Sequence, residues 1–357
     1  MIKVLIINST LERSGLSNVI FYLAKYIDKK QFEMHILTLS PEPANSMWAD
    51  FEKAGVKLHS LKTSRLQSLI NIGSKLKSMV KKIKPNIIHT HSFRGTFFAG
   101  KFFSDFKRVV TIHGVIQDNH SVIYGNLLGK FFANREINSF KKAQARTVVS
   151  AFLKEIYSGF GEIKVIPNAV PSDLFHKASS EEVRELRKRL DIPLDAKVYI
   201  VAGDLIQRKD PVTVVSAFVQ AQVPNSILLV LGKGPLLDAC KQVSNSQVRF
   251  LGQVADVSNY YQMADFLISA SLSEGQGLSV LEGAMCGLTC LVTNLPPHQE
   301  IFAQSAHQVR FFKMGDKHAL AKLIFEEHKS TAPVGEYFSI ADMVNQYQNC
   351  YLSLVHA

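Results

Sequence analysis

Two glutamates flank a glycine turn in the segment ASLSEGQGLSVLEGAMCGLTCLVTN (270–294). We expect Glu274 to end a strand and open the turn, and Glu282 to lie two turns into the following helix. Gly275 and Gly277 allow close backbone approach, and amides at the start of that helix can donate hydrogen bonds. A carboxylate accepts hydrogen bonds from two hydroxyls at once, which suits a sugar or a ribose. The alternative is a helix-start glutamate favoured by the helix dipole, together with a surface glutamate.

Two adjacent cations occupy the segment AGDLIQRKDP (202–211). We expect a strand to end at Gly203, and Pro211 suits the first turn of a helix. Arg208 and Lys209 then lie near a helix N-terminus, which is a favourable place for an anion. A diphosphate needs such compensation, because burying its charge unpaired is costly. The alternative is a solvated charge pair in a turn.

Three histidines, His89, His91 and His113, fall at expected strand ends. A metal site would need a convergent further ligand with fixed geometry, so we expect no metal here. We interpret His89 and His91 as structural and His113 as a site residue. The sequence holds no Asp-x-Asp pair, which argues against a site that binds phosphates through a divalent ion.

Short apolar strands alternate with helical stretches in both halves of the chain. Expected strands lie at 3–8, 33–39, 86–91, 108–113, 145–150, 198–203, 226–232, 248–252, 265–271 and 288–294. Expected helices include 18–28, 181–190 (a surface helix), 211–221 and 277–286. This pattern predicts an α/β protein with two doubly wound, Rossmann-like domains. Such domains bind ligands at the carboxyl ends of their strands, so we expect a ligand there, facing the cleft between the domains.

The predicted domains are residues 1–168 and 169–339, with a C-terminal helix at about 340–357 that packs back on the first domain. The proline-containing segment 166–175 is the expected connection. The chain has 357 residues, of which 46% are hydrophobic, and this length suits two domains. We expect a cytoplasmic protein, because no apolar stretch approaches a membrane span and the four cysteines lack paired metal spacing.

The first half of the chain is strongly basic. Residues 1–170 carry 25 Lys and Arg against 11 Asp and Glu, whereas residues 171–357 carry 16 against 19. Lysines crowd 65–84 and phenylalanines crowd 97–108. Core-facing amphipathic helices explain both segments, and peripheral contact with an anionic membrane is the alternative. Nucleic acid is not an expected partner, since no recognised binding module accompanies the charge.

The segment 270–294 resembles the Glu-x-x-x-x-x-x-x-Glu signature of retaining glycosyltransferases of the GT-B fold, the group 1 or family-four type that includes sucrose synthases and phosphatidylinositol mannosyltransferases. Other segments resemble this family in the same order: TIHG (111–114), VIPNAV…LF (165–175), LGKGPL (231–236), VRFLGQV (248–254) and PHQEI (297–301). The resemblance spans almost the whole chain and is strongest over 198–301. It implies a GT-B fold and transfer of a sugar from a nucleoside diphosphate sugar, without a further cofactor.

The resemblance also implies residue roles. Glu274 would contact the transferred sugar, and Glu282 would hold the ribose diol. Arg208 and Lys209 would neutralise the diphosphate leaving group, and His113 would lie by the sugar. The remaining donor contacts would come from Gly15, Gly203, Val254, Gly275, Gln276, Gly277 and Leu278.

One residue departs from the family pattern. The family usually has Arg directly after the glycine that matches Gly203, where this chain has Asp204. Arg208 is the residue that would supply the missing cation. The resemblance implies a UDP-linked donor and a saccharide or lipid-linked glycan acceptor, in cell-surface polysaccharide or glycoconjugate synthesis at the inner face of the cell membrane. A nucleotide-sugar epimerase and a non-catalytic subunit that binds glycan or stabilises a partner are the alternatives.

Overall fold

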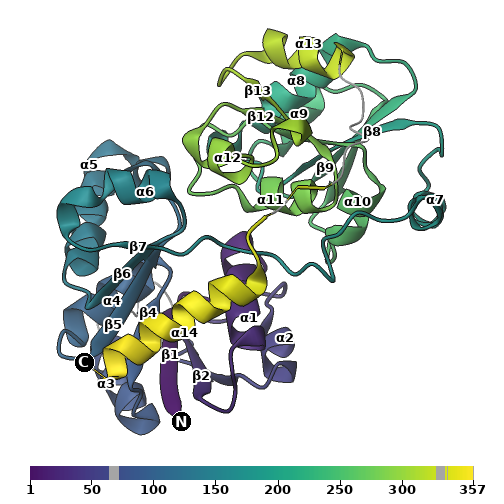
Figure 1. Ribbon diagram of the computed structural model, residues 1–357. Helices are drawn as coiled ribbons and strands as arrows, with labels where there is room; N and C mark the ends of the chain where they lie inside the picture. Colours follow the sequence, from purple (N-terminus) through teal and green to yellow (C-terminus); the bar gives the residue numbers. More distant parts are fainter. Residues whose placement is uncertain (64–71, 327–333, 336, 357) are drawn as a thin grey trace. The chain divides into compact units, whose positions relative to one another are not determined.

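The computed structural model describes residues 1–63, 72–326, 334–335 and 337–356. The chain forms two compact units (Figure 1). Unit 1 comprises Met1–Ala169 together with Phe338–Ala357, and unit 2 comprises Val170–Tyr337. Each unit is described by itself below.

Unit 1 is built on a parallel sheet. Among the described residues it has seven strands, in the order β3-β2-β1-β4-β5-β6-β7. Their bounds are β1 (Ile2–Asn8), β2 (Phe32–Thr38), β3 (Lys57–Ser60), β4 (Ile87–Thr90), β5 (Lys107–Ile112), β6 (Ala145–Val148) and β7 (Lys164–Val165). The helices between them are α1 (Gly15–Tyr26), α2 (Trp48–Lys53), α3 (Ile72–Ile83), α4 (Phe93–Phe102), α5 (Ile116–Lys141) and α6 (Ala151–Ile156).

The last helix, α14 (Ile340–His356), belongs to unit 1, although unit 2 precedes it in the sequence (Figure 1, yellow). The hydroxyl of Tyr351 lies 2.7 Å from Nδ1 of His89 in β4, and the hydroxyl of Tyr347 lies 3.3 Å from Oγ1 of Thr111 in β5. Both tyrosines are fully buried. Helix α14 therefore contributes to the interior of unit 1.

Unit 2 contains a second parallel sheet. Its six described strands have the order β10-β9-β8-β11-β12-β13. Their bounds are β8 (Lys197–Ala202), β9 (Ser226–Leu231), β10 (Val248–Gly252), β11 (Phe266–Ser269), β12 (Thr289–Thr293) and β13 (Val309–Phe312). The helices are α7 (Ser180–Arg189), α8 (Pro211–Ala221), α9 (Leu237–Gln242), α10 (Ser258–Met263), α11 (Leu278–Met285), α12 (Pro296–Ile301) and α13 (Lys317–Glu326).

Each sheet has one point where the strand order reverses. In unit 1 it lies between β1 and β4, and in unit 2 it lies between β8 and β11. Because the helices on the two sides of such a point leave in opposite directions, a crevice opens at the carboxyl ends of the two strands. The predicted α/β fold is confirmed, and each unit has one such strand-order reversal.

The three strands that the sequence pattern does not predict are β3, β7 and β13, which lie at sheet edges. Edge strands pair on one side and tolerate polar residues, so their hydrophobic signal is weak. The prediction that Glu274 ends a strand is wrong, because β11 ends at Ser269. The following residues leave the ladder to form a loop, in which the carbonyl of Ser271 accepts a hydrogen bond of 2.8 Å from Thr293 Oγ1.

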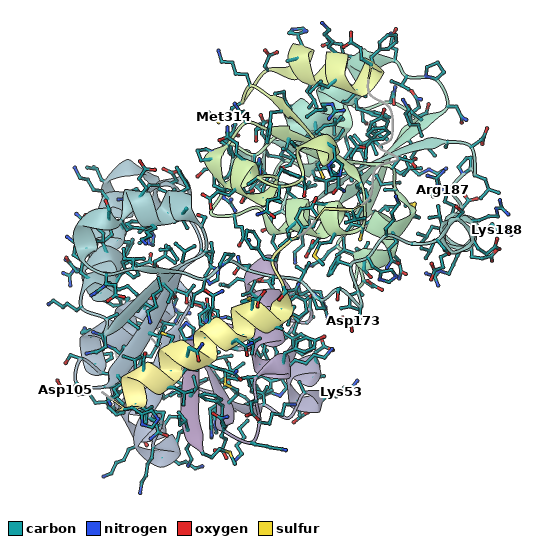
Figure 2. All side chains as sticks on the ribbon, in the orientation of Figure 1. Lys53, Asp105, Asp173, Arg187, Lys188 and Met314 are labelled. Atoms are coloured by element: carbon teal, nitrogen blue, oxygen red, sulfur yellow. The ribbon has the colours of Figure 1, made fainter. Side chains whose placement is uncertain are left out.

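The predicted surface helix at 181–190 is confirmed as α7, with one exception among its cations. Arg187 is buried and donates to Asp265 Oδ2 at 2.8 Å and to the carbonyl of Met263 at 3.0 Å. The next residue, Lys188, is exposed. Figure 2 labels both residues on α7. This buried arginine attaches α7 to the rest of unit 2.

The lysine-rich segment 65–84 and the phenylalanine-rich segment 97–108 contribute to the core of unit 1. Ile72, Leu76, Val80 and Ile83 of α3 are buried, and their cluster includes residues of β1, β2 and β4. Phe98, Phe102, Phe103 and Phe106 pack in or against the same cluster. Core packing therefore explains the apolar side of both segments. Leu66, Leu69 and Ile70 lie outside the described residues.

Candidate functional site

Two loops meet at the strand-order reversal of unit 2. The loop after β8 contains the 3-10 turn Gln207–Lys209, and Asp210 then begins α8 as its N-cap, with φ of 44° and with Pro211 in the first turn. The loop after β11 runs from Ala270 to Gly277, the N-cap of α11. The amide of Leu272 donates to the carbonyl of Arg208 at 2.8 Å, which joins the two loops.

The side chains of these loops form a buried ionic cluster around Glu274. Its Oε1 accepts hydrogen bonds from Lys209 Nζ and from Ser271 Oγ, the latter at 2.7 Å. Its Oε2 accepts from Arg208 Nη1 at 3.2 Å, and the same Nη1 donates to the carbonyl of Ser273 at 2.9 Å. The predicted cations and the predicted carboxylate therefore form one cluster, and the interpretation of Arg208 and Lys209 as a solvated pair is wrong.

The cluster keeps Glu274 ionised. Burial alone would raise the pKa of its carboxyl group, but the charges of Lys209 and Arg208 outweigh burial and lower this pKa to about 2. Arg208, Lys209 and Glu274 together carry a formal charge of +1, and the carboxylate of Asp210, the N-cap of α8, offsets it. The two cations nevertheless lie at a helix start, which is a favourable place for an anionic ligand.

The glycine turn next to Glu274 is tightly packed. Gly277 has φ of 94°, and a Cβ atom there would lie 3.1 Å from Nε2 of His298. His298 is fully buried, and its Nδ1 lies 2.8 Å from the carbonyl oxygen of Thr293, so Nδ1 carries the proton. Its Nε2 is therefore an acceptor, and no hydrogen-bond partner for it occurs among the described residues. Gly275 and Gln276 are buried too, and Leu278 is half-buried.

Glu282 lies in α11 and is 6% exposed. Burial raises the pKa of its carboxyl group to about 8, although the neighbouring Tyr261 hydroxyl and the charge of Lys209 partly oppose the rise. Glu274 and Glu282 are thus held in opposite states near neutral pH, the first ionised and the second mostly protonated. The interpretation of Glu282 as a surface residue is wrong.

The loop after β8 also approaches the neighbouring loop after β9. Gly203 has φ of 148°, and a Cβ atom on Gly232 would lie 1.9 Å from the carbonyl oxygen of Gly203. Only glycine fits at Gly232 without moving this backbone. Asp204 is exposed, and Val254 is half-buried just after β10.

Unit 1 holds the remaining predicted site residues. His113 follows β5, and its Nε2 lies 2.9 Å from Nδ1 of His91, which follows β4. Burial lowers the pKa of His113 to about 4 and that of His91 well below its usual value, so both rings are neutral near pH 7. One ring must donate to the other, so their tautomers are coupled. Gly15 is exposed at the first position of α1.

The third histidine has a structural environment. His89 is buried and bonds to Tyr351 and to Thr111 Oγ1, the latter at 2.8 Å. Among the described residues, no group of three or more His, Cys, Asp or Glu side chains is arranged to hold a metal ion. The four cysteines, Cys240, Cys286, Cys290 and Cys350, are buried and form no disulfide.

Two protein-family models match consecutive parts of the chain. The model described as Glycosyltransferase Family 4 matches residues 13–174, and the model described as Glycosyl transferases group 1 matches residues 182–328. The chain belongs to the group 1 glycosyltransferases of the GT-B fold. The ionic cluster and both glutamates fall in the group 1 match, and His91 and His113 fall in the other.

Curated relatives carry glycosyltransferase names. The alpha-monoglucosyldiacylglycerol synthase of Acholeplasma laidlawii is 29% identical over 242 residues, a match that covers 60% of this chain and 60% of the relative. The UDP-Gal:alpha-D-GlcNAc-diphosphoundecaprenol alpha-1,3-galactosyltransferase of Escherichia coli is 25% identical over 304 residues, which cover 79% and 76% of the two chains. The first name gives a monoglucosyldiacylglycerol product, and the second gives a diphosphoundecaprenol-linked acceptor.

A solved structure shows the same fold. HepE of Anabaena, crystallised in complex with UDP-glucose, has a TM-score of 0.81 and 17% sequence identity, with 99% of this chain and 100% of that chain covered. The predicted GT-B architecture is confirmed. Among the described residues, no helix has the length and apolar character of a membrane span.

Sequence reasoning missed three contributors to these sites. Ser271 and His298 lie against Glu274 and Gly277, and His91 pairs with His113. The segment PHQEI (297–301) is among those that resemble the family, but no role was predicted for His298 from the sequence. Such neighbours depend on how loops from separate strands pack, and sequence spacing does not encode that packing.

Proposed function

We propose that the chain transfers a sugar from a UDP-linked sugar to a saccharide or lipid-linked glycan, with retention of the anomeric configuration. The observation that carries this proposal is the cluster of Arg208, Lys209 and Glu274 at the strand-order reversal of unit 2. It joins two cations, a helix start and a buried carboxylate beside a glycine turn. A nucleoside diphosphate sugar presents the complementary groups, two phosphates and a ring of hydroxyls.

Each candidate site residue has a proposed role. Arg208 and Lys209 bind the diphosphate, and Glu274 accepts hydrogen bonds from the transferred sugar. Glu282 accepts from the ribose diol, and the backbone near Val254 receives the base. Gly203, Gly275, Gln276, Gly277 and Leu278 bring backbone amides close to the donor, and Gly15 and His113 are the proposed contacts from unit 1.

The free protein holds its cations in a resting arrangement. Glu274 neutralises one of the two positive charges, so an incoming diphosphate competes with this carboxylate for Lys209 and Arg208. When the phosphates bind, the carboxylate becomes free to accept from the sugar hydroxyls. Donor binding thus places Glu274 beside the sugar ring, where its charge stabilises the positive charge that develops during transfer.

The proposed reaction uses no protein nucleophile. The bond between the anomeric carbon and the diphosphate oxygen breaks, and the acceptor oxygen forms its new bond on the same face of the sugar. The acceptor's proton passes to the leaving diphosphate, which Arg208, Lys209 and helix amides stabilise. Since these cations hold the phosphates, the reaction requires neither a divalent ion nor a cofactor. Activity should therefore persist in excess chelator.

The acceptor side of the proposal rests on the relatives' names. One names a diacylglycerol product and another names a diphosphoundecaprenol-linked acceptor. We propose a role in cell-surface polysaccharide or glycoconjugate synthesis, on the cytoplasmic side and in peripheral contact with the membrane. The comparisons favour neither the epimerase nor the non-catalytic subunit.

A panel of nucleotide sugars tests this function. The donor should raise the melting temperature of the purified protein, because it binds only the folded state. Product formed from that donor and a lipid-linked acceptor should keep the donor's anomeric configuration, which NMR coupling constants report. An inverted product would exclude the retaining mechanism, and absence of stabilisation by every nucleotide sugar would contradict the proposed function.

A further inference from the structure

Helix α5 has an apolar surface that the core of unit 1 does not use. The helix is kinked at Gly125, where φ is 72° and ψ is 175°. After the kink, three large apolar side chains lie within five residues of each other and are exposed. Leu127 is 89% exposed, Leu128 is 60% exposed and Phe131 is 51% exposed. We call these three residues, together with Lys130 and Arg135, the α5 face.

The opposite side of the same helix supplies the core contacts. Ala133 and Phe140 are buried in a cluster that contains residues of β5 and β6, and Ile137 packs against it. The ring of Phe132 lies 5.5 Å from that of Phe93 in α4. These inward residues anchor the helix, and the apolar residues of the α5 face lie outside their cluster. Their exposure suggests a separate role.

The charges beside these apolar residues have one sign. Between Leu127 and Lys142 the exposed charged side chains are Lys130, Arg135, Lys141 and Lys142. The one carboxylate of this stretch, Glu136, is buried, and its Oε2 lies 2.7 Å from Nε2 of His120. The guanidinium of Arg135 lies 4.9 Å from the ring centroid of Phe131, so cation and aromatic ring share one surface.

We infer that the α5 face docks unit 1 on an anionic lipid bilayer. Apolar side chains that enter the acyl boundary, beside cations at the depth of the lipid headgroups, are the pattern of a helix that lies in a membrane interface. Exposed cations without an exposed carboxylate complement the negative surface of such a membrane. A soluble glycan offers no counterpart for three exposed apolar side chains.

The α5 face is a different membrane-contact surface from the one that the sequence suggests. The sequence offers the segments 65–84 and 97–108 as candidates for membrane contact, but the buried apolar residues of α3 and several phenylalanines of 97–108 pack in or against the core. Helix α3 thus offers charge alone, whereas the α5 face offers charge and apolar surface together. Docking would hold the enzyme at the membrane surface that carries the proposed lipid-linked acceptor, and in this respect it rests on the proposed function. Vesicle binding is nevertheless measurable without donor, acceptor or turnover.

Co-sedimentation with vesicles tests the inference. The full chain should bind vesicles of phosphatidylcholine mixed equally with phosphatidylglycerol, and should bind pure phosphatidylcholine more weakly. The triple variant Leu127→Ser, Leu128→Ser, Phe131→Ser should lower the partition coefficient by about tenfold or more. A matched variant of unit 2, Leu194→Ser with Phe325→Ser, removes side chains that are 50% and 64% exposed and should bind as the wild type does.

Two further measurements separate the surfaces. Lys81→Glu with Lys82→Glu on α3 should weaken binding less than Lys130→Glu with Arg135→Glu on the α5 face. In addition, brominated lipids should quench the fluorescence of the tryptophan introduced by Phe131→Trp. They should not quench the fluorescence of the tryptophan introduced by Phe325→Trp. The chain's single native tryptophan, Trp48, gives the background in the wild type.

Three results would overturn the inference. The first is no binding to anionic vesicles even at low salt, and the second is unchanged binding by the triple variant. The third is self-association that the triple variant abolishes, without vesicle binding, which would make the α5 face a protein interface. Wild-type donor binding by the triple variant would show that its fold and the proposed donor site are intact. If the wild type bound anionic vesicles but no nucleotide sugar, the proposed function would be contradicted and the docking inference would stand.

Discussion

The ammonium group of Lys209 and the carboxylate of Glu274 form an ion pair between residues 65 positions apart in the sequence. The pair connects the loops after β8 and β11, the two strands that flank the strand-order reversal of unit 2. It holds charge beside the carboxyl ends of these two strands in the free protein. A diphosphate that binds here must compete with Glu274 for Lys209 and Arg208.

The two glutamates should separate kinetically. Glu274→Gln removes the charge that competes for Lys209, so UDP should bind at least as tightly as in the wild type. Turnover should fall by about 10²-fold, because a charge that stabilises the transition state is lost. Glu282→Ala should mainly weaken donor binding, since the ribose does not change during the reaction.

Steady-state rates together with calorimetric UDP affinities for both variants check this pattern. Full turnover in Glu274→Gln would make Glu274 a purely structural residue. A Glu282→Ala variant with lower turnover but unchanged donor affinity would move Glu282 from the ribose to the reacting sugar.

Donor affinity should depend on pH through Glu282. Its carboxyl group has a pKa of about 8, raised by burial, so it is mostly protonated at pH 7 in the free protein. Ribose hydroxyls donate to the ionised form, so donor binding releases a proton below pH 8. Affinity for UDP-glucose should therefore rise with pH, by up to about tenfold per unit, and level off above the pKa.

Calorimetry of UDP-glucose binding in buffers with different ionisation enthalpies measures that proton directly. An intact sugar nucleotide is the right probe, because its diphosphate has no group that titrates near neutral pH. Glu282→Gln should bind with no proton release and with a flat pH profile. A slope that persists in this variant would assign the titration to another group.

The neutral pair of His91 and His113 gives a third expectation. We expect His91 to act through His113, whose tautomer it would fix by the contact of 2.9 Å between their ring nitrogens. His91→Phe removes a hydrogen bond that contributes about 1 kcal/mol, so turnover should fall by about fivefold to tenfold. Ring nitrogen shifts of His113 should change from one tautomer to a mixture, and His91→Asn should partly restore both. An unchanged tautomer together with full turnover would leave His91 with a packing role only.

Much of the fold was predictable from local patterns. The buried strands β1, β8 and β9 are continuous apolar runs, and Asp210-Pro211 marks the start of α8. Edge strands such as β3 escaped detection, because one exposed side removes the apolar pattern. The boundary of β11 was misplaced, since Ala270 and Ser271 remain buried after the ladder ends and thus imitate a strand.

The members of the ionic cluster could be selected from the sequence one by one, but their arrangement could not be predicted. Glycine spacing and adjacent cations pointed to Arg208, Lys209 and Glu274, because local conformation and charge can be read from neighbouring residues. That these three side chains bind one another depends on the adjacency of β8 and β11, which the strand order decides. The same holds for the pKa values of the two glutamates, since burial comes from segments that are distant in sequence.

Arg208 and Lys209 are the proposed ligands of the donor's diphosphate. Replacing both by Met would leave Glu274 buried without its partners, which is strongly destabilising. The triple variant Arg208→Met, Lys209→Met, Glu274→Gln avoids that unpaired charge, and Glu274→Gln alone is its matched control. Circular dichroism and a melting curve establish that both are folded.

Calorimetric titration of UDP into these two variants is the most direct measurement. Each charge-assisted contact contributes about 1.5–3 kcal/mol, so the triple variant should bind UDP about 10²-fold to 10⁴-fold more weakly than Glu274→Gln. Equal affinity of the folded triple variant and its control would contradict the account, because the diphosphate would then be held by other groups.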